Sequence, residues 1–207
     1  MLPRVCEPPP EDAKLDAEAY REMDHEEVNK RFVLDLLESG PVGPRVVDLG
    51  CGPALIPIIL CETLEAIAEE STGADQPHAN PDELQVMGVD SCVEMLELAQ
   101  VEIDFAGRLD QIQLEHADLN DLSSLQSELA ETVISNTVLH HLDSPENALR
   151  LAMKVLRPGG VCLSETSIAL KTKRRSNDSS NSMAAPRATR PPQPLLGNCS
   201  GNRCMPR

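Results

Sequence analysis

Short apolar runs alternate with amphipathic stretches from residue 45 to residue 168. Compact runs rich in Val, Ile and Leu predict buried strands, and apolar residues at intervals of three and four predict helices. Strands are expected at residues 46–50, 84–90, 111–118, 132–139 and 159–168. Helices are expected at residues 53–70, 91–107, around 121–130, and 144–156. This alternation is typical of an α/β fold, in which helices cover both faces of a mainly parallel sheet of about five strands.

The two ends of the chain have a different pattern. Residues 1–14 are rich in proline and charge, which predicts a loose leader. Residues 15–40 have no helix breaker before Gly40, which predicts one or two helices that form an N-terminal cap on the α/β domain at residues 41–170. Residues 171–207 combine low hydrophobicity with Ser, Asn, Pro and Arg, which predicts a disordered tail.

Charge is divided unevenly between the domain and the tail. The tail holds eight Lys or Arg and one acid, a net charge of +7. The whole chain carries −16, which leaves −23 for residues 1–170. A body this acidic repels phosphate backbones, so nucleic acid is not its expected substrate. A contact between the basic tail and nucleic acid or an acidic protein is an alternative.

The number and spacing of the cysteines and the length of the apolar runs indicate in which cellular compartment the protein is expected. The seven cysteines are odd in number and contain no C-x-x-C pair, which favours reduced thiols over a disulfide framework or a zinc site. No apolar run approaches the roughly 20 residues of a membrane span. The first residues lack the apolar core of a signal peptide. We therefore expect a cytoplasmic protein with no metal centre and no membrane contact.

Polar residues follow four successive strands of the predicted sheet: Asp48, Asp90, Asp118 and Asn136. In open α/β sheets, ligands bind at the carboxyl ends of the strands. Asp and Asn also cap helices at such positions, which is the alternative for any single one of them. Four polar residues at four successive strand ends favour a ligand site over four independent caps.

The first strand ends in the glycine-rich turn VVDLGCGPA at residues 46–54. A dinucleotide turn of the form G-x-G-x-x-G needs a third glycine where this chain has Leu55. A triphosphate-binding loop needs a following G-K-S or G-K-T, which the sequence lacks. The small residue of this turn is instead Ala54, one position before Leu55. The resulting pattern D-x-G-x-G-x-A at residues 48–54 resembles the loop of class I S-adenosylmethionine-dependent methyltransferases, whose usual form is D/E-x-G-x-G-x-G.

The resemblance to these methyltransferases extends over residues 45–166. The segments VMGVDSCVEMLELA, EHADLNDL and ISNTVLHHLDSPENALRLAMKVLRPGG are similar to further motifs of the family, in the family's order. The likeness implies a Rossmann-like three-layer sandwich with S-adenosyl-L-methionine as its cofactor. It implies no particular methyl acceptor.

The resemblance also assigns roles to the residues at the strand ends. It implies that Asp48 and the two glycines of the turn hold the methionine part of the cofactor, where Asn136 closes the site. It implies that Asp90 accepts hydrogen bonds from both ribose hydroxyls, and that Asp118 accepts one from the adenine amino group. The implied cofactor-binding set is Asp48, Gly50, Cys51, Gly52, Asp90, Ser91, Asp118, Leu119 and Asn136. An acidic site suits a sulfonium cation.

Two sets of side chains are candidates for contact with the methyl acceptor. His140 and His141 follow the fourth predicted strand, and the resemblance places them beside the methyl group, where one could act as a base. Packing within a loop or capping a helix is the alternative for this pair. On the N-terminal segment, His25 and Asn29 are four residues apart and share a helix face. The resemblance implies that this segment covers the cofactor and helps to form the acceptor pocket, and a solvated helix face is the alternative.

The sequence thus predicts a methyltransferase that acts by in-line displacement on an unidentified small-molecule acceptor. The alternative is a cofactor-binding but inactive module that acts through protein interaction. The family's sheet normally continues after the fifth strand with a helix and two strands, and residues 169–207 have no such pattern. This change indicates a truncated, alternatively ended or frame-shifted chain. It also predicts an exposed fifth strand through which copies could associate.

Overall fold

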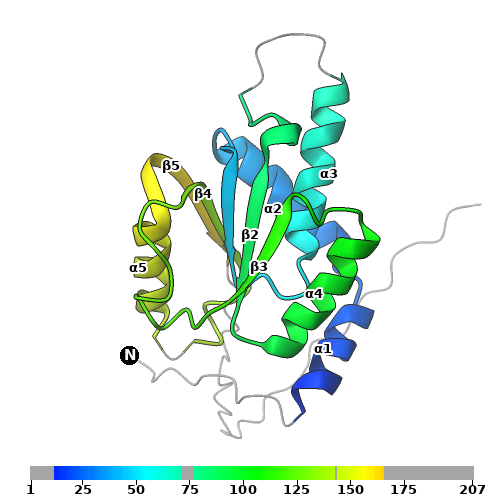
Figure 1. Ribbon diagram of the computed structural model, residues 1–207, viewed down its shortest axis with the longest axis vertical. Coiled ribbons are helices and arrows are strands. Elements are labelled where there is room, and N and C mark those ends of the chain that lie inside the picture. Colours follow the sequence, from blue (N-terminus) through cyan, green and yellow to red (C-terminus); the bar gives the residue numbers. More distant parts are fainter. Residues whose placement is uncertain (1–11, 71–76, 143, 166–207) are drawn as a thin grey trace, which may run out of the picture. The chain divides into compact units, whose positions relative to one another are not determined.

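The computed structural model describes residues 12–70, 77–142 and 144–165, so the predictions for residues 1–11 and for the tail lie outside the described residues. Helices α1 to α5 span Ala13–Glu22, Glu26–Ser39, Leu55–Glu70, Val93–Phe105 and Pro145–Val155, with a 3-10 turn η1 at Pro81–Glu83. Strands β1 to β5 span Arg45–Leu49, Gln85–Asp90, Ile112–His116, Ala130–Asn136 and Leu156–Glu165 (Figure 1). The predicted α/β fold is confirmed, with one helix of the prediction missing.

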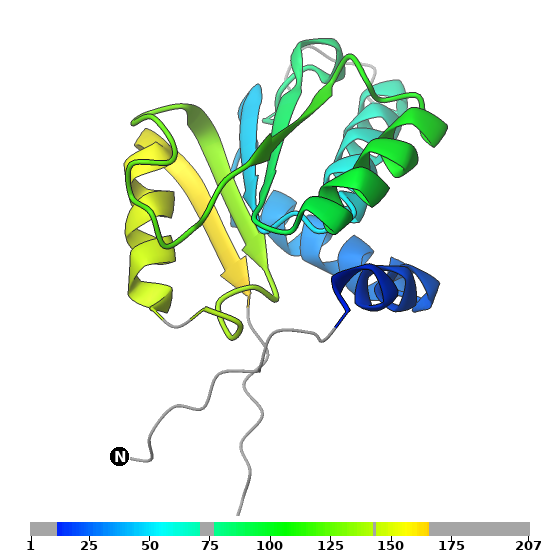
Figure 2. The ribbon, with the colours of Figure 1, turned by 60° about the horizontal axis from the view of Figure 1, so that its bottom comes forward.

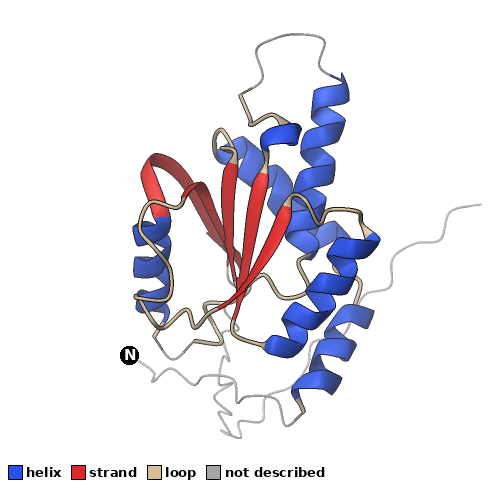
Figure 3. Ribbon diagram, in the orientation of Figure 1, coloured by secondary structure: helices blue, strands red, loops and turns tan. Residues whose placement is uncertain are grey.

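The five strands form one parallel sheet in the order β3-β2-β1-β4-β5 (Figure 3). Because all strands run the same way, their carboxyl ends lie along one edge of the sheet. Strands β2 and β3 follow β1 on one side of it, whereas β4 and β5 lie on its other side, so the direction in which strands are added reverses at β1. Ligands of open α/β sheets bind at such a reversal of strand order.

Helices cover both faces of the sheet, as Figure 2 shows, with α5 on one face and α2, α3 and α4 on the other. Alternate residues of each strand supply the two cores. On β1, Val46 packs with α2, α3 and α4, whereas Val47 packs with α5. This confirms the predicted three-layer sandwich. None of the described helices is both long enough and apolar enough to span a bilayer.

The N-terminal cap consists of two helices. Helix α1 begins after Asp12, whose carboxylate accepts hydrogen bonds from two backbone N–H groups of the first turn at 3.1 Å. Helix α2 begins after His25, where the carboxylate of Asp24 accepts from the Glu26 N–H at 3.1 Å. An ion pair of 2.6 Å between Arg21 and Glu102 ties α1 to α4, and α2 packs along α3.

The helix expected around residues 121–130 was wrong, because this segment forms a series of turns. Asp121 accepts hydrogen bonds from both the N–H and the hydroxyl of Ser123, at 2.8 and 2.6 Å, which competes with helix formation. The ammonium group of Lys154 on α5 donates to the carbonyls of Leu122 and Leu125, both at 2.6 Å. A helix in this segment would use such carbonyls internally, so a residue distant in sequence decides the conformation.

Two boundaries near the site differ from the sequence-based expectation. Strand β4 ends at Asn136, not at residue 139, because Thr137 adopts a left-handed φ of 60°. The sequence predicted a helix from residue 53, in which Pro57 would fall in the second turn. Helix α3 begins only at Leu55, so Pro57 lies in the first turn, where the backbone N–H has no intrahelical partner in any case.

The start of β5 also differs from the prediction. The sequence predicted a strand from residue 159, but β5 begins at Leu156, directly after α5. A register irregularity opposite Ala130 and Thr132 accommodates the residues Leu156–Gly160 in the strand. Within the described residues, β5 is an edge strand of the sheet, as the sequence predicted.

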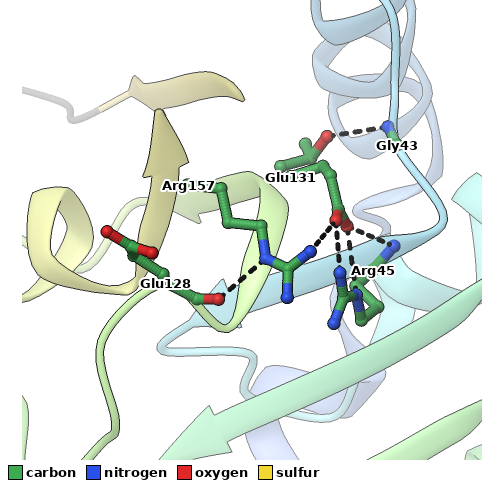
Figure 4. A network of polar contacts seen from close by, with 6 residues as sticks. Gly43, Arg45, Glu128, Glu131 and Arg157 are labelled. Carbon is green, nitrogen blue, oxygen red and sulfur yellow. Dashed lines mark hydrogen bonds and ion pairs between the residues drawn. The ribbon is translucent and has the colours of Figure 1, made fainter. Parts of the chain in front are cut away.

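A charged network fixes the amino-terminal edge of the sheet, opposite the site (Figure 4). The carboxylate of Glu131 on β4 pairs with Arg45 on β1 at 2.5 Å and with Arg157 on β5 at 2.8 Å. Burial alone would raise the pKa of Glu131, but the hydrogen bonds from Arg45 outweigh it and hold this pKa below its usual value. The network thus joins three adjacent strands, β1, β4 and β5.

Candidate functional site

The turn after β1 is held in a conformation that requires glycine. The N–H groups of Gly50 and Cys51 both donate to the carbonyl of Val89 on β2, at 2.7 and 3.0 Å. Gly50 has a left-handed φ of 79°, and a Cβ atom at this position would lie 2.1 Å from Cγ2 of Val138. Gly52 also has a left-handed φ, of 53°, but a Cβ there would meet nothing within 4 Å. The backbone at Gly52 therefore borders open space.

Ala54 completes the turn under strain. Its φ of 59° lies in the left-handed region, which costs an L-residue other than Gly roughly 1–2 kcal/mol. Its methyl group is fully buried, and its carbonyl accepts the first hydrogen bond of α3, from the Ile58 N–H at 3.1 Å. Glycine, the residue usual at this position in the resembling family, would relieve the strain. Alanine at this position instead buries a methyl group in the core.

Asp90, at the end of β2, joins the turn to the next helix. Its Oδ2 accepts from the N–H of Gly52 at 2.9 Å, and its Oδ1 accepts from the N–H of Cys92 at 2.8 Å. Each carboxylate oxygen retains a second lone pair. The carboxylate is therefore fixed by two backbone N–H groups and can still accept hydrogen bonds from a ligand.

Asp48 is a buried carboxyl group beneath the turn. It is 1% exposed, and its Oδ2 has no hydrogen-bond partner among the described residues. Burial, and secondly the negative charge of Asp90, raise the pKa of Asp48 to about 8. A buried oxygen of this kind is costly unless a ligand donates to it or its charge is balanced by a cation.

A cavity of about 40 Å³ lies beside Asp48 and Gly52. It brings together the turn, the end of β4 and the N-terminal cap. The residues that line it are Tyr20, Asn29, Asp48, Gly50, Cys51, Gly52, Pro53, Leu55, Ile56 and Asn136. Of the predicted set, it therefore unites Asp48, Gly50, Cys51, Gly52 and Asn136.

The N-terminal cap contributes two polar side chains to this cavity. Asn29 on α2 is 6% exposed, which removes the alternative that its helix face is solvated. Tyr20 on α1 is half-buried, and burial, followed by the charges of Asp48 and Asp90, raises the pKa of its phenol. The Tyr20 ring stacks on the ring of His25 with a centroid distance of 4.2 Å. The cap thus places a phenol and an amide over the acidic end of the site.

The remaining predicted cofactor residues lie outside the lining of the cavity. Asp118 is exposed, and its Oδ1 accepts from the N–H and the side-chain amide of Asn120, at 2.8 and 3.0 Å. Leu119 is 4% exposed and packs with the α5 side of the core. Ser91 is exposed, and its carbonyl accepts from Nε2 of His116 at 3.1 Å. These residues continue the same edge of the sheet beyond Asp90.

His140 and His141 lie in a turn after β4 and are not among the residues that line the cavity. Their rings contact each other with a centroid distance of 3.9 Å and an interplanar angle of 41°. The chain enters this turn through Val138, the residue against which Gly50 packs. The proposed catalytic role of the pair stays a prediction.

Cys51 is a packing residue of the turn. It is 7% exposed, and its sulfur would lie 2.9 Å from a Cβ atom added to Gly88 on β2. Burial raises the pKa of the Cys51 thiol, and the charges of Asp48 and Asp90 raise it further. The thiol is therefore kept neutral, and Cys51 acts as a small packing side chain of the turn.

Sequence reasoning missed the apolar side chains of the site. Val138, Pro53 and Ile56 shape the turn and the cavity, but aliphatic residues carry no chemical signal in a sequence. The carboxyl groups of the site are hydrogen-bond acceptors, which suit a ligand with a cationic end and a pair of hydroxyl groups. An unpartnered buried carboxyl oxygen at Asp48, open space at Gly52 and a fixed carboxylate at Asp90 fit the methionine and ribose parts of S-adenosylmethionine.

Comparison with known proteins agrees with this geometry. Residues 47–164 match the family model described as "Methyltransferase domain". The chain is 27% identical over 129 residues to a ubiquinone biosynthesis O-methyltransferase of Psychrobacter arcticus, across 62% of this chain and 43% of the relative. The chain thus spans less than half the length of that curated relative.

Solved structures share the fold. An O-methyltransferase family protein from Burkholderia thailandensis superimposes with a TM-score of 0.57 at 15% identity, over 73% of this chain and 40% of that one. A candidate S-adenosylmethionine-dependent methyltransferase from Methanococcus maripaludis gives a TM-score of 0.55 at 19% identity, over 73% and 62% of the two chains. At these identities the structures support the fold alone. From the family match over residues 47–164, the chain belongs to the methyltransferase domain family, whose cofactor is S-adenosylmethionine.

Proposed function

We propose that this chain carries the cofactor-binding part of a methyltransferase that methylates a small molecule. The observation that carries the proposal is the buried Asp48, whose Oδ2 has no partner among the described residues and which lines the cavity together with the glycine turn. A carboxyl group in this position favours a ligand with a cationic group. The family match supports the reaction class.

The proposed roles follow from the hydrogen-bonding chemistry of the residues at the strand ends. Asp48 would hold the amino group of the methionine part, and Asn136 would close the same end. The Gly52 backbone would approach the ligand, because no side chain fills the space in front of it. Asp90 would accept hydrogen bonds from vicinal ribose hydroxyls, which suit one carboxylate. Asp118 would accept from the adenine amino group.

S-adenosylmethionine supplies, when bound, a methyl group on a sulfonium sulfur, which is already an excellent leaving group. The protein's contribution is then alignment of the acceptor and exclusion of water. Tyr20 and Asn29 of the cap would exclude water above the site. A base is needed only where the acceptor must lose a proton, and His140 and His141 are candidates for that role.

The size of the cavity sets a condition on this proposal. A volume of about 40 Å³ holds one or a few water molecules, whereas ligand pockets measure roughly 300–1,000 Å³. Entry of the cofactor therefore requires the cap to move. We propose that α1 is the part of the cap that moves, because its ion pair with α4, Arg21–Glu102, contributes at most about 1 kcal/mol.

Calorimetric titration of the full chain with S-adenosylmethionine, S-adenosylhomocysteine and NAD tests the proposal. We expect roughly micromolar binding of the two sulfur nucleosides and none of NAD. Asp90→Ala should abolish binding, and Asp104→Ala, which removes an exposed carboxylate on α4, should not. A folded chain that binds neither sulfur nucleoside would refute the proposal. Binding without methyl transfer to any acceptor would favour an inactive module.

A further inference from the structure

Thr137, the first residue after β4, has a backbone conformation that its residue type disfavours. Among the described residues, the non-glycine residues with a left-handed φ are Ala54, Glu128 and Thr137, and of these Thr137 alone is β-branched. Branching at Cβ makes its φ of 60° a clear outlier. Strain of this kind is concentrated at functional sites. Glycine would adopt the same φ without strain, so the threonine side chain is the feature to explain.

The neighbouring residues hold Thr137 at its backbone and at its side chain. Its N–H donates to the carbonyl of Glu165 on β5 at 2.9 Å, which fixes the backbone at the end of the sheet. Its hydroxyl donates to Oδ1 of Asn136 at 3.0 Å. The strained residue therefore supplies a hydrogen bond to the preceding side chain, which glycine could not supply.

Asn136 is the residue through which this hydrogen bond reaches the candidate site, because it lines the cavity beside Asp48. An amide side chain has an oxygen that accepts hydrogen bonds and an NH2 group that donates them. The hydroxyl of Thr137 occupies Oδ1, whereas the NH2 group donates to none of the described residues. We propose that Thr137 is a positioning residue, which orients the Asn136 amide so that its NH2 group meets the ligand.

The chemistry of the cavity indicates which part of the ligand the amide binds, and here the inference rests on the proposed function. The methionine part of the cofactor carries an ammonium group and a carboxylate. Asp48 suits the ammonium group, but the residues that line the cavity include no Lys or Arg for the carboxylate. Neutral donors must therefore bind it. An amide whose oxygen is already engaged offers two N–H groups for this purpose.

Two nucleosides test the proposal by calorimetry on the full chain. S-adenosylhomocysteine has the amino acid end, and methylthioadenosine has the same nucleoside without it. Asn136→Asp replaces the NH2 group by an oxygen atom of similar size. We expect S-adenosylhomocysteine to bind this variant at least about tenfold more weakly, and methylthioadenosine to bind it as it binds the natural chain. Unchanged or tighter binding of S-adenosylhomocysteine would overturn the proposal, because position 136 would then not donate to a carboxylate.

Two variants of Thr137 test its own contribution. Thr137→Val keeps the branched shape and removes the hydroxyl, whereas Thr137→Ser keeps the hydroxyl. The valine variant should bind S-adenosylhomocysteine roughly three- to tenfold more weakly, and the serine variant should bind it like the natural chain. Thr63→Val is the matched control, because the Thr63 hydroxyl donates to the carbonyl of Ile59 within α3, at 2.7 Å, and should leave the affinity unchanged. Equal affinity in the valine and serine variants would contradict the proposal.

A third variant separates positioning from stability. Thr137→Gly relieves the strained φ and also removes the hydroxyl. We expect its thermal midpoint to equal that of the natural chain or to exceed it by up to about 4 °C. Its affinity for S-adenosylhomocysteine should fall as in the valine variant. If the midpoint and the affinity fall together, Thr137 acts through the stability of the fold, and the positioning role is refuted.

The natural chain distinguishes failure of this inference from failure of the proposed function. If it binds neither nucleoside, the proposed function fails and this inference fails with it. If it binds S-adenosylhomocysteine and the affinity responds to no substitution at position 136 or 137, the cofactor site stands and the positioning role alone is refuted.

Discussion

The backbone N–H of Gly52 donates to Oδ2 of Asp90 at 2.9 Å, which ties the turn after β1 to the end of β2. The same carboxylate accepts from Cys92 at the start of α4. One side chain thus fixes the relative positions of two strand ends and one helix before any ligand binds. Its roles in structure and in binding can be separated by substitution.

Asp90→Asn keeps one acceptor oxygen, whereas Asp90→Ala removes both. The alanine variant should lose two charge-assisted hydrogen bonds, roughly 1.5–3 kcal/mol each at most, together with the proposed contact to the ribose. We expect S-adenosylhomocysteine to bind about tenfold more weakly to the asparagine variant and below detection to the alanine variant. Thermal unfolding and calorimetry measure the two effects. Undiminished binding by a folded alanine variant would rule out the ribose role.

Asp48 should make the stability depend on pH in an unusual direction. Its pKa is about 8 in the folded protein and 3.8 as the reference value, so between these values the folded state holds a proton that the unfolded state has lost. The contribution of Asp48 to the free energy of unfolding therefore falls as pH rises through this window, by up to about 1.4 kcal/mol per pH unit. Below and above the window it is constant.

Asp48→Asn removes this titration. The stability of the variant relative to the natural chain should therefore increase from about pH 4 to about pH 8. Denaturant unfolding at several pH values measures the difference, and Asp104→Asn serves as the control with an exposed carboxylate. A stability difference that does not change with pH would show that Asp48 is ionised in the fold.

The same group should couple cofactor affinity to pH. A cationic ligand favours ionised Asp48, so the affinity for S-adenosylhomocysteine should rise from about pH 6 to about pH 8. The amino group of the ligand also titrates, but that contribution is common to the natural chain and to Asp48→Asn. Calorimetry on both proteins isolates the part that Asp48 contributes, and parallel pH profiles would contradict this prediction.

Gly50→Ala should be far more harmful than Gly52→Ala. The added Cβ at position 50 would lie 2.1 Å from Val138, whereas at position 52 it would meet nothing. We expect Gly52→Ala to cost about 1–2 kcal/mol through its left-handed φ and to block ligand approach, and Gly50→Ala to cost several kcal/mol. The double variant Gly50→Ala with Val138→Ala should recover part of the stability. No recovery would mean that backbone strain, and not the contact with Val138, dominates.

Glu131→Gln should weaken the amino-terminal edge of the sheet. The carboxylate is shared by Arg45 and Arg157, so the substitution replaces two ion pairs by weaker hydrogen bonds, at a cost of about 1–3 kcal/mol at neutral pH. The pKa of Glu131 is lowered in the fold, so its stabilising effect is lost as pH falls below the unfolded value. The two proteins should therefore converge in acid. Ligand binding, at the opposite edge, should be unchanged in the folded variant.

The sequence predicted those features of the fold that depend on local pattern. Alternation of apolar runs predicted the strands, and the helix expected from residue 144 begins at Pro145. The helix expected near residue 125 failed because Lys154, far along the chain, binds its carbonyls. The predicted start of β5 was wrong because a register shift against β4, between Ala130 and Thr132, takes Leu156–Gly160 into the strand.

The candidate site also contains residues that the sequence predicts and residues that it does not. Asp48 and Asp90 are predictable because their strand ends and their chemistry appear in the sequence. The convergence of Tyr20 and Asn29 on Asp48 is not, because the sequence left open whether the face of Asn29 covers the site or is solvated. The packing of α1 and α2 against α4 and α3 decides between the two. The strain at Ala54 also has no sequence signal beyond a departure from glycine.

Because Cys51 packs against Gly88, the reactivity of its thiol depends on whether the turn lies against β2. A thiol that is buried and kept neutral does not react with alkylating reagents, which attack the thiolate, so modification of Cys51 requires the turn to lift away from β2. The alkylation rate of Cys51 therefore measures how often the turn opens, with the exposed Cys162 as an internal reference for reagent activity. A ligand that holds the turn closed would slow the reaction of one cysteine and leave the other unaffected.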